Sequence, residues 1–506
     1  MVSVGRGGGR PTASPPDVPV GTLRNHHRRR GLLPWLLVAA AVALTVSCSA
    51  GGREPVDPAS LSFPPPSATE APTTSTPTPP STASDTIVTG GDVRVGMWAD
   101  PDPTAPTLAG AAVRSLVLPQ LFTPTPDGGW TPSLVEPGSD VLAPDQRSAS
   151  FRLREGARWS DGTPITVDDL RAGADTTFVT DVLDDGRGTV TVEFNQPLPG
   201  WRRLWSGVDT VPAPAAGVYG GPWMVGDRTE GLETVLVPNP RWWGDRPLLD
   251  SLTLVVVPDQ TTLLDLFDAG ELDVVAPWPA PGVVTRLGGG ADAAWVAGRP
   301  GGWQTELVAN PDRLDLISRQ AALGAVDPAD LVGALIPAEA VVPSAGSEAP
   351  DDSVRPGSLR QEAEITAAED VPMGATVARA IQFAVRDGGG EVPEQRVAPS
   401  DVTEAWTAEQ DFDLVVETVY LGPNPCWTCR WAWIDEATAR LTDGGAPVDA
   451  MEEVLRREAV RRVLWQPVPL LAWNSAVHGP AVNGFAVTPA WNSQTWWKEP
   501  PNTGNP

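Results

Sequence analysis

The chain has 506 residues, of which 41% are hydrophobic and 20% charged, so it can bury a sizeable core and wholesale disorder is excluded. Its formal net charge of −27 argues against nucleic acid as a partner, because a polyanion needs a basic face. Three His and three Cys are too few for a histidine-rich metal site or a cysteine cluster. We therefore expect no metal and no cofactor.

The first part of the chain is typical of a bacterial export signal. Arginines at positions 24–30 precede an apolar run over residues 32–46, which is shorter than the ~20 residues of a membrane-spanning helix. The run leads to Cys48 in a pattern that resembles a lipobox, although Thr45 stands three residues before the cysteine and the usual Leu lies one position earlier. We expect residues 1–48 to be a lipoprotein signal that ends in a lipidated Cys48, which would hold the protein on the extracytoplasmic face of the cell membrane. An ordinary signal peptide or a signal anchor is the alternative.

A tether and then an α/β module follow. Residues 49–88 are rich in Pro, Ser and Thr and nearly free of large apolar side chains, so we expect a disordered, extended tether. The alternation over residues 93–98 predicts a strand. An apolar strand over 252–257 is followed by a helical run over 261–269, which Gly270 should end. Strands that alternate with helices predict an α/β protein.

Three sequence blocks carry a resemblance to a known family. The segment Phe151–Leu170 reads FRLREGARWSDGTPITVDDL, in which Thr166 and Asp169 predict the start of a helix. It resembles the signature of family 5 extracellular solute-binding proteins, which are the oligopeptide-, dipeptide- and nickel-binding components of ABC importers. Residues 221–274 and 319–327 are similar to two further blocks of that family, in the same order. The resemblance extends over nearly all of the chain after the tether.

The resemblance implies an α/β, two-lobed periplasmic-binding-protein fold (type II-like), with a hinge, a ligand cleft between the lobes and an extra small domain in the first lobe. We expect the first lobe over residues 89–300, with the small domain inserted at about 108–210. The second lobe would cover residues 301–474. Residues 475–506 would return to the first lobe.

The resemblance also implies a function. The expected protein is not an enzyme but a monomeric, extracytoplasmic solute-binding lipoprotein. It would capture a ligand, foremost a peptide, for the permease subunits of an ABC importer. The alternative is a lipoprotein of the same fold recruited to a non-transport role, such as regulation of cell-envelope glycolipid assembly. Two departures from the family pattern favour this non-transport alternative. Few residues separate Asp169 from the next strand at Val190, and the loop after residues 412–416 lacks the aspartate that holds the α-amino group in peptide binders.

Candidate ligand-binding residues are aromatic. The candidates are Trp98, Trp303, Trp427, Trp431 and Trp433. The first two lie near strand ends that face the cleft in the family pattern, and the other three lie in the loop after residues 412–416. A tryptophan combines a large apolar face with one hydrogen-bond donor, which suits stacking against sugars, peptides or planar ligands. Packing in the core is the alternative for each of them.

The same loop contains Cys426, Cys429 and Arg430. Two cysteines this close in an exported protein favour a disulfide that shapes the loop, with a redox pair or two free thiols as alternatives. No other metal ligands accompany the pair. Arg430 is a candidate for contact with an anionic ligand group, with a plain surface position as the alternative.

Overall fold

The structure is a computed structural model that describes residues 89–500, with gaps. The gaps are 106, 281, 290–292, 300, 336–340, 344–358, 360–361, 369–372, 389–393, 399–401, 404–405, 408 and 421–454. Cys48 and the loop that carries Cys426, Trp427, Cys429, Arg430, Trp431 and Trp433 lie outside the described residues. Within the described part, no helix combines the length and the apolar character that crossing a bilayer requires.

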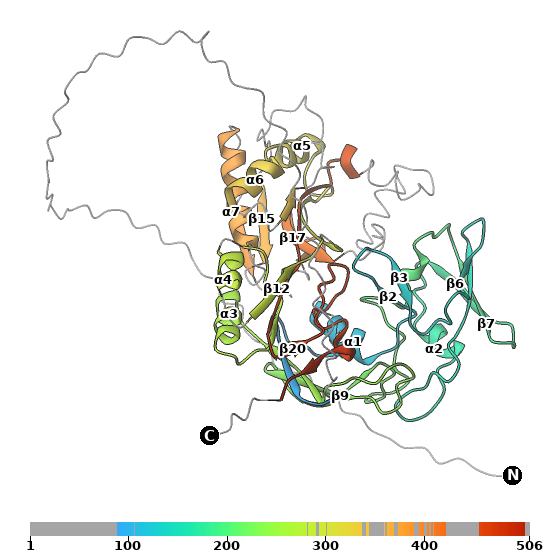
Figure 1. Ribbon diagram of the computed structural model, residues 1–506. Helices are drawn as coiled ribbons and strands as arrows, with labels where there is room; N and C mark the ends of the chain where they lie inside the picture. The colour runs from blue at the N-terminus through green and yellow to red at the C-terminus, as the bar shows by residue number, and fades with distance from the viewer. Residues whose placement is uncertain are drawn as a thin grey trace, which may run out of the picture. The chain divides into compact units, whose positions relative to one another are not determined.

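The first sheet has seven strands (Figure 1). In spatial order they are β12 (Ala293–Ala297), β19 (Leu470–Asn474), β11 (Val274–Val275), β1 (Asp92–Met97), β10 (Ser251–Val256), β9 (Glu233–Pro238) and β8 (Trp223–Thr229). Strand β1 pairs in parallel with β10 and β11, whereas the other pairs are antiparallel. Val93 and Val95 are fully buried on β1, which confirms the strand predicted from their alternation.

Three helices of the described residues accompany this sheet, and side chains cap the first two at their N-termini. They are α1 (Leu108–Val117), α3 (Gln260–Asp268) and α4 (Val283–Gly289). The Thr107 hydroxyl accepts a hydrogen bond from the Gly110 N–H at 3.1 Å, and the Asp259 carboxylate accepts one from the Thr262 N–H at 2.9 Å. Gly270 follows α3 with a φ of +74°, a left-handed conformation that glycine adopts without strain. The predicted end of this helix is thereby confirmed.

A small domain with its own core lies between α1 and β8 in the sequence. Its four-stranded antiparallel sheet has the order β4 (Val141–Leu142), β5 (Ser148–Arg152), β7 (Thr189–Phe194) and β6 (Val179–Asp184), and β2 (Phe122–Pro124) with β3 (Trp130–Pro132) forms a separate hairpin. The helix α2 (Val167–Ala172) begins as predicted, because Asp169 accepts a hydrogen bond from the Thr166 N–H at 2.7 Å. Trp159, Trp201 and Phe151 are among the large side chains of the buried core.

The second sheet has six strands and its own core. In spatial order they are β14 (Val341–Pro343), β18 (Arg461–Pro467), β13 (Trp303–Ala309), β17 (Leu414–Tyr420), β15 (Glu364–Ala368) and β16 (Glu394–Ala398). Leu307 and Ala309 of β13 face this core with Ile365 of β15, and side chains of the accompanying helices pack against them. Those helices are α5 (Leu316–Gly324), α6 (Pro328–Leu335) and α7 (Gly374–Asp387), which Figure 1 shows beside the sheet.

Two short connections run between the sheets. One joins β12 to β13, and the other joins β18 to β19. The connections are bonded to each other, because the Gly298 N–H donates to the Pro469 carbonyl at 2.8 Å. Paired crossovers of this kind form a short double strand about which two lobes can rotate.

The last described residues lie against the first sheet. Strand β20 (Val477–His478) pairs with β21 (Trp497–Lys498), and short 3₁₀ turns occur at Trp201–Arg203 and Ser493–Thr495. The Lys498 Nζ lies 2.9 Å from Asp273 Oδ1 and donates to the Asp92 carbonyl at 2.9 Å. This lysine therefore ties the last described residues to the beginning of β1.

Candidate functional site

Three aromatic side chains from the two sheets meet where their strands begin or end. Trp278 follows β11 of the first sheet, and its backbone N–H donates to the Gln260 side chain at 2.8 Å. Trp303 begins β13 and Tyr420 ends β17, and the two residues are opposite each other in the second sheet. The Trp303 ring centroid lies 5.5 Å from that of Trp278 and 5.4 Å from that of Tyr420, both edge to face. This aromatic cluster (Trp278, Trp303 and Tyr420) therefore joins the two sheets.

Tyr420 also contacts two segments outside the second sheet. Its hydroxyl donates to the carbonyl of Phe485, and burial raises the pKa of this phenol above its ordinary value. A Cβ on Gly207 would lie 3.7 Å from the same hydroxyl, so the chain at Gly207 passes close to the tyrosine. The aromatic cluster is thus next to the segment that begins at Leu204, which we call the 204–213 segment.

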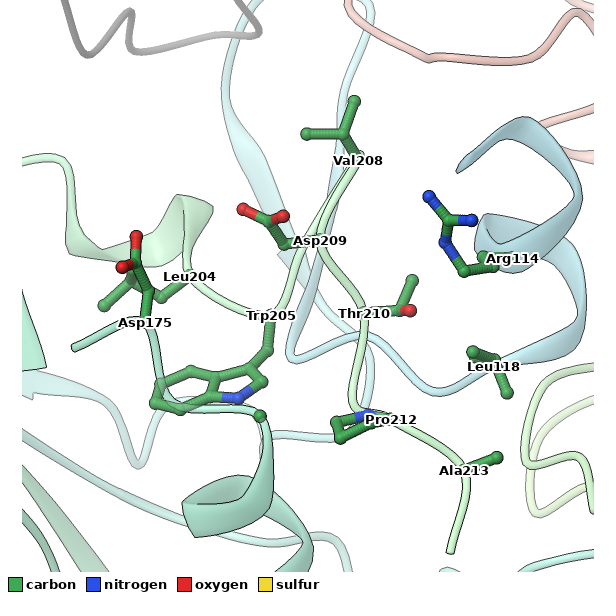
Figure 2. Close-up of a pocket in the computed structure, with 11 residues that line it drawn as sticks. Arg114, Leu118, Asp175, Leu204, Trp205, Val208, Asp209, Thr210, Pro212 and Ala213 are labelled. Atoms are coloured by element: carbon green, nitrogen blue, oxygen red, sulfur yellow. The ribbon is translucent and has the colours of Figure 1, made fainter. Parts of the chain in front are cut away.

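A cavity of about 470 Å³ lies between α1 and the 204–213 segment (Figure 2). Its apolar lining comes from Leu118, Leu204, Trp205, Val208, Pro212 and Ala213. Its polar side chains are Arg114, Asp175, Asp209 and Thr210. Pockets that take small ligands have this size range and this mixture of apolar walls with a few polar groups.

Backbone hydrogen bonds hold the 204–213 segment in place. The Leu121 N–H donates to the Trp205 carbonyl at 2.9 Å, and the Val211 N–H donates to the Pro119 carbonyl at 2.9 Å. Trp205 is buried and has a φ of +51°, a left-handed conformation that is strained for a bulky residue. The segment therefore keeps one conformation only because its surroundings fix it.

The ionisable groups around the cavity influence one another. Burial raises the pKa of the Asp209 carboxyl and Asp175 raises it further, while Arg203 and Arg114 act in the opposite direction. Burial lowers the pKa of the Arg203 guanidinium, which Asp209 and Asp175 partly offset. Acidic and basic groups thus lie close enough together at this cavity to influence one another.

The predicted site residues have different positions in the structure. Trp303 belongs to the aromatic cluster. Trp98 is half-buried and packs against the hydrophobic residues under α3 and α4, among them Leu263 and Phe267. Its part in ligand binding stays a prediction, as do those of Trp427, Trp431, Trp433 and Arg430, which lie outside the described residues.

Several residues of the site were not predicted from the sequence. Trp278 had a usable signal, since it stands shortly after the apolar pair Val274–Val275, and ligands bind beyond strand ends in α/β sheets. Tyr420 ends a strand in the same way. Asp209 had no such signal, because a single acid in a loop is usually a solvated surface group. Among the described residues, no group of three His, Cys, Asp or Glu is placed to hold a metal ion.

The combination of two sheets, a paired crossover, a small domain and a cavity beside the junction defines a two-lobed solute-binding fold. The model of the middle region of bacterial extracellular solute-binding proteins, family 5, matches residues 130–370. Over this region the chain is similar to the family 5 extracellular solute-binding proteins.

Two relatives of known name illustrate the similarity. The oligopeptide-binding protein OppA of Mycobacterium tuberculosis is 31% identical over 207 residues, which cover 32% of this chain and 34% of that protein. The probable monoacyl phosphatidylinositol tetramannoside-binding protein LpqW of the same organism is 29% identical over 249 residues, covering 41% of this chain and 37% of that protein. The chain thus spans about a third of the length of the curated relatives it matches.

Solved structures share the fold over most of the chain. The oligopeptide-binding protein AppA of Bacillus subtilis, in complex with a nonapeptide, gives a TM-score of 0.65 at 14% identity and covers 82% of this chain and all of that chain (100%). A dipeptide-binding protein of Pseudoalteromonas sp. SM9913, in complex with Met-Leu, gives a TM-score of 0.66 at 14% identity, with 81% and 100% covered. The predicted fold class is confirmed.

Proposed function

We propose that this protein is an extracytoplasmic lipoprotein that captures a small solute, foremost a peptide, and delivers it to the permease subunits of an ABC importer. The observation that carries the proposal is the aromatic cluster at the junction of the two sheets, with the cavity beside it. Closure of two lobes about a hinge traps a ligand at such a junction. The relative named OppA and the AppA structure with its nonapeptide support a peptide as the solute.

The test is native mass spectrometry of the protein that begins after the tether, purified from cells under mild conditions. We expect a fraction of the protein to carry a bound solute, and fragmentation of the complex should give the solute's mass and class. A protein that carries no solute, and that binds none from a library of short peptides, would contradict the proposal.

Replacing Trp303 with Ala should weaken binding of that solute by at least about fivefold, because a stacking aromatic face contributes ~1 kcal/mol beyond its buried area. Titration of the purified solute by calorimetry measures the effect. Trp242→Ala is the matched control, since Trp242 is also half-buried and contacts the tilted ring of Trp243 at a centroid distance of 4.1 Å, away from the aromatic cluster. Equal affinity of Trp303→Ala and the unchanged protein would show that this tryptophan only packs.

The proposed lipid anchor on the cell membrane can be tested by replacing Cys48. The proposal rests on the basic and apolar pattern of residues 24–46 and on the cysteine that follows. Wild-type protein should incorporate a labelled fatty acid and fractionate with the membrane, and Cys48→Ala should lose the label. Membrane-bound protein with an uncleaved N-terminus in both forms would instead establish a signal anchor.

A second function is favoured by the relative LpqW, whose printed name gives it a probable lipid ligand, monoacyl phosphatidylinositol tetramannoside. On this alternative the chain would act in cell-envelope glycolipid assembly without solute transport. The same mass spectrum separates the two functions, because a mannosylated lipid differs from a peptide in mass and in its fragments. Recovery of a glycolipid in place of a peptide would favour the alternative.

A further inference from the structure

We propose that residues 481–486, which we call the strap, hold the lobes of the two sheets closed on each other through contacts of the protein alone, with the Tyr420 hydroxyl as the latch. The inference goes beyond the proposed function, because it concerns the conformation of the protein before any solute binds. Its grounds are the anchorage of the strap, its backbone contact with a crossover, and its hydrogen bond to the second sheet.

The beginning of the strap is anchored to the first sheet. The strap lies between β20 and β21 in the sequence, and Val482 packs against the core of the first sheet. The carbonyl of Ala481 accepts a hydrogen bond from the Trp491 indole Nε1 at 2.7 Å. The strap therefore moves with the lobe of the first sheet.

The small domain fixes the next part of the strap. Asn483 is 8% exposed, and its side-chain amide donates to the Pro124 carbonyl at the end of β2 at 2.8 Å. The Oδ1 of the same side chain accepts a hydrogen bond from the Phe485 N–H at 2.9 Å. A Cβ on Gly128 would lie 3.1 Å from the Phe485 ring, so this ring packs directly against the turn between β2 and β3. These contacts determine where the Phe485 carbonyl lies.

At Gly484 the strap contacts one of the crossovers, backbone against backbone. The Gly302 N–H donates to the Gly484 carbonyl at 2.8 Å. A Cβ on Gly301 would lie 2.0 Å from the Gly484 carbonyl carbon, so no side chain fits between the two segments. The strap therefore lies directly on the connection from β12 to β13, about which the lobes can rotate.

The second sheet reaches the strap through Tyr420. The Tyr420 hydroxyl donates to the Phe485 carbonyl, and the Tyr420 ring meets that of Trp303 at a centroid distance of 5.4 Å. Tyr420 belongs to β17 and moves with the second sheet, whereas Phe485 is held by the small domain. A rotation that separates the lobes must break this hydrogen bond.

The closed conformation thus has a contact that the open conformation lacks, and this contact requires no solute. A contact made in only one of two conformations shifts the population toward that conformation. Because a solute can enter only while the lobes are open, the latch also slows association.

Small-angle X-ray scattering of the solute-free protein tests the latch. The protein that begins after the tether is unfolded in denaturant and refolded, and native mass spectrometry verifies that no solute remains. Tyr420→Phe removes only the hydroxyl. It should raise the ratio of open to closed molecules by about two- to tenfold, which is the effect of one lost hydrogen bond, and so increase the radius of gyration.

The chain offers a matched control and a second way to open the lobes. Tyr219 is the only other tyrosine of the sequence, is half-buried and packs against the core of the first sheet, so Tyr219→Phe should leave the radius of gyration unchanged. In Gly484→Ala the new Cβ would lie 2.7 Å from the Arg299 carbonyl, which should push the strap off the crossover and increase the radius without altering Tyr420.

The outcomes separate this inference from the proposed function. An unchanged radius of gyration for Tyr420→Phe, or an equal increase for Tyr219→Phe, would overturn the latch, and a thermal melt verifies that each variant is folded. If Tyr420→Phe opens a protein that carries and binds no solute, the proposed function fails and the latch stands. A bound solute together with an unchanged radius for Tyr420→Phe would give the reverse result.

Discussion

Replacing Arg461 with Met is expected to lower the free energy of unfolding by about 3–5 kcal/mol. The Arg461 Nη1 lies 2.7 Å from Glu306 Oε2 inside the second sheet, and the two side chains are 3% and 0% exposed. The Gln304 amide donates to the same oxygen at 3.3 Å. Removal of the guanidinium leaves the Glu306 charge in a site that water does not reach, and that desolvation dominates the cost.

Denaturant unfolding of Arg461→Met measures this cost, and two further variants make the result specific. Arg457→Met removes an exposed arginine whose Nε lies 3.3 Å from Glu458 Oε1, and should cost no more than about 1 kcal/mol. The double variant Glu306→Met, Arg461→Met removes both charges and should recover most of the loss. A loss below 1 kcal/mol for Arg461→Met would show that the pair does not support the second sheet.

Replacing Trp201 with Ala is expected to destabilise the small domain by about 3–5 kcal/mol. Trp201 is 1% exposed, stacks on Phe151 at a centroid distance of 5.7 Å and meets the edge of Phe122 at 5.4 Å. Its indole Nε1 has no hydrogen-bond partner among the described residues, so the cost comes from lost packing and from the cavity left behind.

Near-UV circular dichroism and limited proteolysis can follow the small domain separately. Trp201→Ala should lower the temperature at which this domain becomes sensitive to protease, whereas Trp201→Phe keeps a ring against Phe151 and should cost less. Unchanged sensitivity of Trp201→Ala would mean that the four-stranded sheet is stabilised chiefly by other contacts.

Local features of the fold could be predicted from the sequence because neighbouring residues determine them. The apolar run at 252–257 corresponds to β10, and the helical run at 261–269 to α3, each within one residue. Thr166 with Asp169, and Gly270, mark a helix start and a helix end through backbone hydrogen bonds and conformation that these residues themselves supply.

The candidate site could be predicted only in part, because it is formed by residues that are far apart in the sequence. Trp303 meets Tyr420 through the antiparallel register of β13 and β17, and it meets Trp278 only because the two sheets adjoin there. Neither relation leaves a periodic pattern along the chain.

The strand order of the first sheet also constrains when this protein can fold. Among the described strands, β12 is hydrogen-bonded in that sheet only to β19, and β19 is formed by residues 470–474. During synthesis, therefore, β12 lacks this partner until residues 470–474 have been made. Contacts between segments so far apart in sequence form slowly, because the long intervening loop must first be closed. The first sheet can therefore be completed only after residues 470–474 have been synthesised.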